Sequence, residues 1–247
     1  MIIGDALKIM VELPAWSVDL IYVDEAYDDL DKARSIGTTT RLKESNGSNR
    51  KWYEVISYSK IIPLYARLLK KGHHLYQWRP SINMDSVRNW CKLIDPDFGL
   101  LAESGFTVAK VLPGEKSFTG MGYSFRSKHE CLLFSILSIK NKVQLNDLSL
   151  PDIINEKWVN PRSGERIHDS QKPTEVARKI IECSSTEDDL VLEPFAGSMQ
   201  AAQANGLFNM NRKVIGIEKD RAIAELTISY FKDHNIPLDV IDSLKWQ

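Results

Sequence analysis

The segment Leu190-Val-Leu-Glu-Pro-Phe-Ala-Gly-Ser-Met199 decides the fold of this chain. Its apolar start indicates a buried strand, Gly197 indicates a sharp turn, and a helix is expected to begin near Gln200. About twenty residues further on, Val214–Glu218 is a second apolar run that ends in an acid. This pattern is typical of Rossmann-like sheets, in which a glycine turn approaches a cofactor and the acid accepts a ribose hydroxyl. An ordinary βαβ unit, with Gly197 serving only the turn, is the alternative interpretation.

The rest of the chain continues the alternation of strands and helices. Short apolar runs are separated by amphipathic segments, which indicates an α/β fold with a mostly parallel sheet. We expect strands at Val18–Val23, Leu75–Trp78, Thr107–Leu112, Cys131–Ser135, Leu190–Glu193 and Val214–Glu218. We expect helices at Ser57–Lys70, Ile82–Leu93, Pro173–Ser184, Gln200–Phe208 and Arg221–Asp233. No helical segment separates the third and fourth strands, so these two are expected to form an antiparallel hairpin.

Length and composition fit one globular domain. The chain has 247 residues, of which 43% are hydrophobic and 26% charged, so we expect a single domain over residues 1–247. Residues 141–169 are polar and contain Pro151 and Pro161, so we expect a short irregular insert there. No apolar run is long enough to span a membrane, and the first twenty residues lack the pattern of a signal peptide.

Cysteine and histidine usage indicates a reduced compartment. The three cysteines lie far apart and form no CxxC pair, so we expect a cytoplasmic protein with neither a disulfide framework nor a metal site. His73 and His74 are adjacent, and a helix could not aim both at one metal. We expect them to end a helix and begin a strand.

Charge restricts where a nucleic acid can bind. The formal net charge is −1, so any basic footprint must be local. Residues 32–51 carry six basic side chains against Glu44 alone, a local charge of +5. The candidate phosphate contacts there are Arg41, Lys43, Arg50 and Lys51. A solvated surface loop with no partner is the alternative.

The strand Val18–Val23 is followed by Asp24-Glu-Ala-Tyr27, an acid and an aromatic three residues apart. Ligands of open α/β sheets bind beyond the carboxyl ends of strands, where such a pair could hold a planar, amine-bearing group. An acidic turn at a helix N-terminus is the alternative, and it is favoured on spacing alone.

Several motifs together resemble one family. They are Gly4-Asp-Ala-Leu7, Ser17-Val-Asp-Leu-Ile-Tyr-Val-Asp24, His168-Asp-Ser-Gln-Lys-Pro173, Asp189-Leu-Val-Leu-Glu-Pro-Phe-Ala-Gly-Ser198 and Ile215-Gly-Ile-Glu218. In this order and spacing the chain resembles the beta group of amino-methyltransferases of DNA, which use S-adenosylmethionine. Their motif order is circularly permuted, with the catalytic strand before the cofactor strand. The resemblance implies a Rossmann-like methyltransferase sheet, mostly parallel with one antiparallel hairpin strand.

The resemblance also assigns residues to the cofactor. Lys172 would neutralise the carboxylate of its methionine end, and Glu218 would accept its ribose hydroxyl. The full set of cofactor candidates is Asp5, His168, Gln171, Lys172, Pro173, Glu193, Phe195, Ala196, Gly197, Ser198 and Glu218.

The catalytic candidates implied by the resemblance are Asp24, Ala26 and Tyr27. The Asp24 carboxylate and the Ala26 carbonyl would accept the hydrogens of an exocyclic amine, which concentrates its lone pair on nitrogen in line with the methyl group. Tyr27 would stack on a base flipped out of the duplex. N6 of adenine is favoured over N4 of cytosine because this loop begins with Asp rather than Ser.

Both loops depart from the family pattern. Asp-Glu-Ala-Tyr stands where Asp-Pro-Pro-Tyr is usual, so the fixed backbone of two prolines is lost and Glu25 adds charge beside the target. Glu193 stands where Asp is usual, and Met199 stands where a glycine is usual. A side chain at Met199 is expected to crowd the cofactor and weaken its binding.

The resemblance therefore predicts a DNA methyltransferase of the kind found in DNA modification and restriction-modification. DNA is the expected partner, a homodimer or partner subunit is possible, and no membrane contact is expected. Two alternatives remain open. The chain could be an impaired homologue that binds nucleic acid or supports an active subunit. It could also be a transferase with a reshaped pocket that acts on RNA or another amine.

Overall fold

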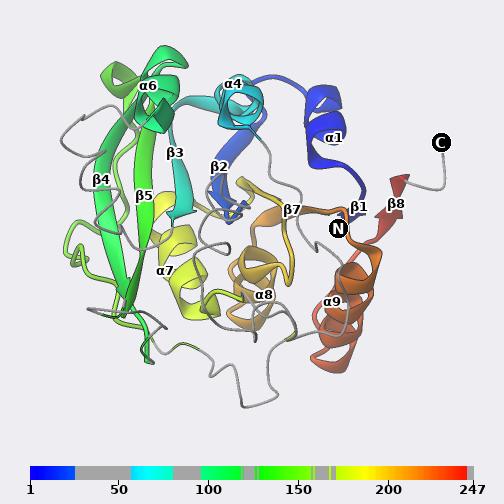
Figure 1. The fold of residues 1–247 in the computed structure, drawn as a ribbon. Coiled ribbons are helices and arrows are strands. Elements are labelled where there is room, and N and C mark those ends of the chain that lie inside the picture. Colours follow the sequence, from blue (N-terminus) through cyan, green and yellow to red (C-terminus); the bar gives the residue numbers. More distant parts are fainter. Residues whose placement is uncertain are drawn as a thin grey trace.

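The structure is a computed structural model that describes residues 1–25, 57–79, 96–117, 119, 126, 128–156, 158, 167 and 171–243. Within these ranges one sheet of eight strands has the order β4-β5-β3-β2-β6-β7-β1-β8 (Figure 1). The strands are β1 (Ile2–Ile3), β2 (Val18–Val23), β3 (Leu69–Arg79), β4 (Phe106–Glu115), β5 (His129–Leu137), β6 (Leu190–Pro194), β7 (Lys213–Glu218) and β8 (Ile241–Asp242).

The directions of the strands place the carboxyl ends of several of them at one edge of the sheet. β2 pairs in parallel with β3 and β6, and β6 pairs in parallel with β7. β5 is antiparallel to both β3 and β4, so β4 runs in the same direction as β3. This confirms the predicted mostly parallel sheet with an antiparallel hairpin. The carboxyl ends of β2, β3, β4, β6 and β7 consequently meet at one edge of the sheet.

Helices cover both faces of the sheet (Figure 1). They are α1 (Ala6–Glu12), α4 (Tyr58–Leu68), α6 (Pro96–Glu103), α7 (Thr174–Ser184), α8 (Gln200–Leu207) and α9 (Arg221–Asp233). The alternation of side chains along β2 divides the core, because residues two apart point to the same face. Ile21 and Val23 pack with α1, α4 and α6, whereas Leu20 and Tyr22 pack with α7 and α8. The predicted helix Ile82–Leu93 lies outside the described residues.

Two predicted boundaries around α4 are wrong. The helix was expected to reach Lys70, but it ends at Leu68 and β3 begins directly at Leu69. His73 and His74 therefore lie within a strand rather than between a helix and a strand. His74 is buried and contacts the Phe134 ring edge-on, with ring centroids 5.1 Å apart. This cross-strand packing extends β3 beyond the apolar run that the sequence shows.

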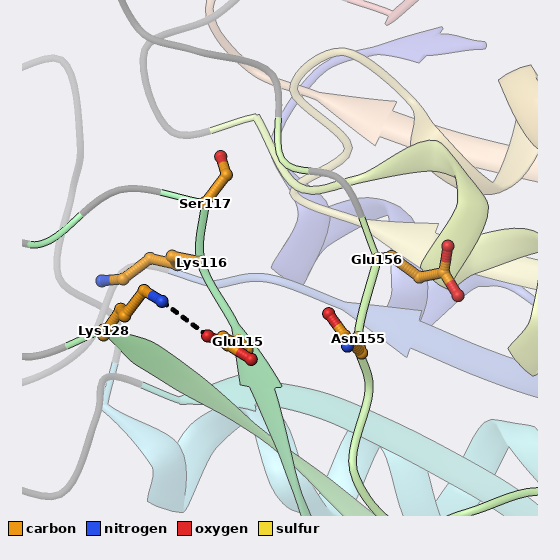
Figure 2. Close-up of a pocket in the computed structure, with 6 residues that line it drawn as sticks. All are labelled: Glu115, Lys116, Ser117, Lys128, Asn155 and Glu156. Atoms are coloured by element: carbon orange, nitrogen blue, oxygen red, sulfur yellow. Dashed lines mark hydrogen bonds and ion pairs between the residues drawn. The ribbon is translucent and has the colours of Figure 1, made fainter.

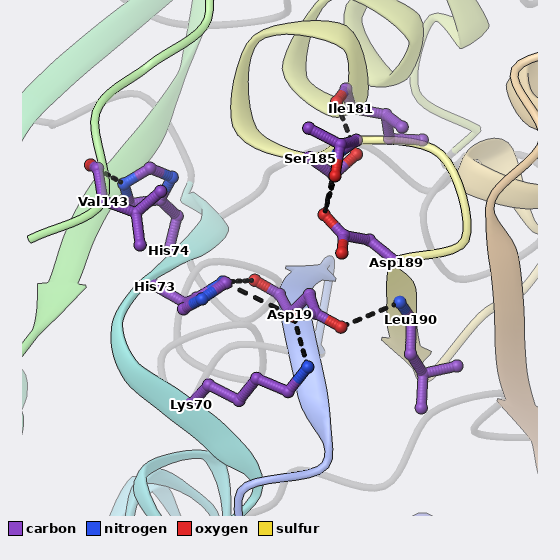
Figure 3. Close-up of polar contacts among 10 residues, drawn as sticks. Asp19, Lys70, His73, His74, Val143, Ile181, Ser185, Asp189 and Leu190 are labelled. Carbon is purple, nitrogen blue, oxygen red and sulfur yellow. Dashed lines mark hydrogen bonds and ion pairs between the residues drawn. The ribbon is translucent and has the colours of Figure 1, made fainter.

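The amino-terminal edge of the central strands is stabilised by a buried carboxylate. Asp19, in β2, lies 2.6 Å from Nζ of Lys70 and accepts the Leu190 backbone N–H at 3.1 Å (Figure 3). His73 Nδ1 lies 2.8 Å from the Asp19 carbonyl oxygen, which accepts its hydrogen. Asp19 thus links β2, β3 and β6 at the edge opposite to Asp24. Among the described residues no helix is long and apolar enough to cross a membrane.

Candidate active site

The loop between β6 and α8 turns sharply through residues with positive φ. Phe195, Gly197 and Met199 have φ values of 57°, 50° and 56°. The Gly197 N–H donates to Oε2 of Glu218 at 2.8 Å, and the Ala196 N–H donates to the Ile217 carbonyl at 2.8 Å. A Cβ added at Gly197 would meet no atom of the described residues within 4 Å. The loop is therefore fixed to β7 while open space remains beside Gly197.

Met199 does not project into that space. Its side chain is fully buried, and its terminal methyl lies where a Cβ on Gly216 of β7 would be, only 2.4 Å from that position. It packs in a cluster with β1, α8 and α9. The expectation that a thioether crowds the cofactor is therefore wrong about the side chain. What the substitution costs is backbone strain, because a left-handed φ disfavours a residue with a Cβ.

Glu218 and Asp5 lie close together beyond the ends of β7 and β1. The Glu218 carboxylate accepts the backbone N–H of Gly197 and, at 2.7 Å, that of Asp220, and burial raises its pKa. The backbone of Gly4 donates to the Glu218 carbonyl at 2.8 Å. Asp5 caps α1 and lies 3.1 Å from Nζ of Lys219. Two acids from distant parts of the sequence thus lie at the neighbouring ends of β7 and β1, and one of them, Glu218, is bonded to the glycine loop.

Glu193 and Ser198 hold the start of α8. Glu193 is buried and accepts the Ala201 N–H at 3.1 Å. Burial raises the pKa of Glu193 to about 8. The Ser198 hydroxyl accepts from Nε2 of Gln200, and its carbonyl accepts from Nε2 of Gln203, both at 2.5 Å. These contacts fix the loop between β6 and α8 at the start of the helix.

Asp24 follows the carboxyl end of β2 and is held by a buried lysine. Nζ of Lys172 lies 2.7 Å from Oδ2 of Asp24 and 3.3 Å from Oε2 of Glu130. Lys116 Nζ lies 3.6 Å from the other Glu130 oxygen. The Lys172 ammonium also lies 5.6 Å from the centre of the Trp78 ring. Four charged groups of alternating sign therefore run from the end of β4 to the end of β2.

Glu25 points away from this row of charges. It continues the alternation of β2, so its side chain enters the face covered by α4 and is only 2% exposed. Nε2 of Gln77 donates to its Oε1 at 2.8 Å, and Arg79 Nη1 lies 3.9 Å from the same oxygen. Burial raises the pKa of Glu25. The expectation that Glu25 adds charge beside the target is therefore wrong.

The other predicted site residues divide into two groups. Gln171 and Pro173 are buried beside Lys172, and Oε1 of Gln171 accepts the Ile167 N–H at 3.0 Å. Several predicted residues lie outside the described part of the chain: Ala26, Tyr27, His168, Arg41, Lys43, Arg50 and Lys51. The glycine loop, Glu218 and Asp24 all lie at the same edge of the sheet, as their positions after parallel strands predict.

Known proteins share both this sequence pattern and this fold. Residues 18–229 match the family described as N6_N4_Mtase, DNA methylase. The chain belongs to this DNA methylase family. It is 27% identical to the DNA adenine methyltransferase YhdJ of Escherichia coli K12, over 87% of the chain and 76% of that relative.

Two solved structures share the fold of the methylase. The M1.HpyAVI complex with S-adenosylmethionine has a TM-score of 0.63 at 20% identity, and the match covers 93% of this chain and 97% of the other. The PvuII cytosine-N4-specific DNA methyltransferase has a TM-score of 0.63 at 15% identity, with coverages of 98% and 94%. The sequence relative is named for adenine, and the second of these solved structures is named for N4 of cytosine.

Sequence reasoning missed Glu130 and Trp78 as parts of the site. The sequence predicts a hairpin strand that begins at Cys131, which excludes Glu130, and it places Trp78 only at the end of a strand. Period-two alternation gives part of the signal, because Tyr22, Trp78 and Leu132 share one face of the sheet, and Asp24 and Glu130 follow at the same spacing. The missing information was the register between β3 and β5.

A cavity of about 510 Å³ adjoins the hairpin end of the methylase. Figure 2 shows its lining residues, which are Glu115, Lys116, Ser117, Lys128, Asn155 and Glu156. Lys128 is paired with Glu115 at 2.7 Å, and Lys116 connects this cavity to the charges around Asp24. Two lysines are thus balanced by two glutamates, so the cavity itself has no net basic character.

Proposed function

We propose that this methylase transfers a methyl group from S-adenosylmethionine to the exocyclic amine of a DNA base, with N6 of adenine as the preferred acceptor. One observation carries the proposal. The Asp24 carboxylate is held at the carboxyl end of β2 by Lys172, at the same sheet edge as the open glycine loop and Glu218. In this proposal Asp24 serves as the acceptor for amine hydrogens and the glycine loop with Glu218 serves as the cradle for the cofactor, which supports transfer between two groups bound at one edge of the sheet.

The residues present fit this cofactor. Open space beside Gly197 leaves room for a ligand close to the backbone, and Glu218 is fixed next to it by two N–H donors. Gly197, Ser198, Glu218 and Asp5 would hold the adenosine part, while the segment Gln171–Pro173 would contact the methionine part. When bound, the cofactor supplies a methyl group on a positively charged sulfur.

The protein contributes positioning. An exocyclic amine is a weak nucleophile because its lone pair is delocalised into the ring of the base. Asp24 accepts one of its hydrogens, which draws the lone pair back onto nitrogen, and the Ala26 carbonyl is proposed to accept the other. Tyr27 is proposed to stack on the flipped base. Arg41, Lys43, Arg50 and Lys51 are proposed to contact phosphates, which contributes affinity rather than sequence recognition.

The structure favours an active enzyme over the two alternatives. An impaired homologue was favoured by the altered loops, yet Met199 and Glu25 both turn their side chains into the core. A reshaped pocket was favoured by Glu25 beside the target, and its burial removes that argument. The choice between adenine and cytosine rests on Asp24 alone.

The test is methylation of unmethylated DNA with methyl-labelled S-adenosylmethionine, followed by digestion and separation of the nucleosides. We expect label in N6-methyladenine, and an Asp24→Ala variant should lower kcat at least about 100-fold. Asp152→Ala is the matched control, because this exposed carboxylate pairs only weakly with Lys110 at 3.2 Å. Label confined to N4-methylcytosine would contradict the base preference. Cofactor binding without any label in DNA would contradict the proposed transfer to DNA.

A further inference from the structure

Lys172 lies between two carboxylates that come from different parts of the fold. Its side chain is 7% exposed, and its Nζ lies 2.7 Å from Asp24 and 3.3 Å from Glu130. Burial disfavours the charge on Lys172, but Asp24 and Glu130 outweigh this effect and raise its pKa. The lysine therefore remains a cation inside the protein and attracts both acids.

The geometry favours Asp24 as the group that this lysine serves. The Asp24 and Glu130 side chains are similarly exposed, at 26% and 23%, but Asp24 follows β2, which pairs directly with β6, the strand that leads into the glycine loop. Glu130 is anchored on the rigid hairpin, where it is paired in register with Gly114. Lys116 neutralises its second oxygen. Glu130 thus fixes the ammonium of Lys172, and Lys172 in turn fixes one oxygen of Asp24.

We infer that Lys172 and Glu130 are a positioning pair for Asp24, which orients its carboxylate toward the amine of the target base. This inference rests on the proposed methyl transfer and gives Lys172 a role other than neutralising the carboxylate of the cofactor. Positioning matters because a hydrogen-bond acceptor misplaced by about 1 Å can lower the rate about 100-fold. Glu130 contacts neither reacting group in this arrangement and acts only through Lys172.

The first experiment compares kcat with cofactor affinity. Glu130→Gln should lower kcat 10-fold or more while the Kd for S-adenosylmethionine, measured by calorimetry, changes less than twofold. Lys172→Met should lower kcat further. Glu115→Gln is the matched control, because it makes the same change on the same hairpin at an exposed ion pair with Lys128. Its kcat should stay within twofold.

The opposite pattern would overturn the inference. Unchanged kcat in Glu130→Gln, together with a 10-fold weaker Kd in Lys172→Met, would assign Lys172 to the cofactor instead. Thermal melting of each variant checks folding, and a Glu130→Asp variant should recover part of kcat if the negative charge is what matters.

A second measurement needs no turnover. Asp24→Asn and Glu130→Gln are compared singly and together in urea unfolding, since two acids that share one buried cation should not act independently. The double variant should differ at least threefold in its unfolding equilibrium constant from the product of the single effects. Coupling of this size in a protein that methylates no DNA would support the positioning pair and contradict the proposed function. Independent effects would reject the pair even if DNA is methylated.

Discussion

The buried carboxyl of Glu193 makes the stability of this methylase depend on pH. Burial beneath the glycine loop raises its pKa from 4.5 to about 8. A carboxyl that is neutral in the fold but ionised in the unfolded chain costs about 1.4 kcal/mol per pH unit between the two pKa values. Over the whole interval between the two pKa values, the free energy of unfolding falls by about 5 kcal/mol, and about 3 kcal/mol of it is already lost at pH 7.

The sign follows from proton binding. Above pH 4.5 the folded state holds a proton on Glu193 that the unfolded state has released. The contribution of Glu193 to the free energy of unfolding is therefore complete below pH 4.5 and is lost as the pH rises through 8. Glu193→Gln removes the titrating group, and its amide oxygen can still accept the Ala201 N–H. An unsatisfied amide donor would cost about 1–2 kcal/mol at every pH. The pH-dependent part of the difference is unaffected by that constant cost.

Urea unfolding at pH 5 and pH 8 measures the effect. The stability of Glu193→Gln relative to the wild type should rise by about 3 kcal/mol between these values, because all other titrating groups cancel in the difference. Glu187→Gln, at an exposed carboxyl, is the control and should change stability by less than about 0.5 kcal/mol at both values. A difference between Glu193→Gln and wild type that stays constant with pH would refute the assignment of a neutral Glu193.

Three further predictions concern buried side chains. Burial lowers the pKa of His74 to about 4, so the free energy of unfolding should fall as the pH drops from 6.5 through 4. His74→Gln should remove about 3 kcal/mol of that loss, measured by acid unfolding. Met199→Gly should lower the free energy of unfolding by about 2 kcal/mol, because the packing that is lost outweighs the relief of the positive φ. Calorimetry of the same variant should show no tighter binding of the cofactor. Gly216→Ala should destabilise by about 1–3 kcal/mol through contact with Met199, and Met199→Ala in the same chain should recover part of this in urea unfolding.

The sequence predicts the fold well where local pattern and burial agree. β2, β6 and β7 are short apolar runs with clear turns after them, so their predicted positions match the structure within one residue. The short helix α1 was missed because seven residues are too few for a periodic signal. Its cap was still readable, since Asp5 precedes Ala6 and accepts the N–H groups of Leu7 and Lys8.

The site was predictable only as separate pieces. Asp24, Gly197 and Glu218 could be found because each follows an apolar strand, and parallel strands bring such residues to one edge. The contact of Lys172 with Asp24 could not be found, because the two residues lie far apart in the sequence and belong to no common helix or strand pair. The position of Glu130 depends on the register of β5 against β3. The alternation of apolar residues does not fix this register, because a shift of two residues leaves the same side chains on each face of the sheet.

The two altered loops use side chains where the family pattern uses backbone restraint. Glu25 replaces a proline, but its buried carboxylate is bonded to Gln77 and lies near Arg79, so the residue after Asp24 is tied to β3. Met199 replaces a glycine, but its side chain packs on Gly216, two residues before Glu218 in β7. Each of these two side chains therefore adds a tertiary contact to a neighbouring strand. Because these contacts lie at the strand ends that carry Asp24 and Glu218, packing against the neighbouring strands supports the positions of both residues.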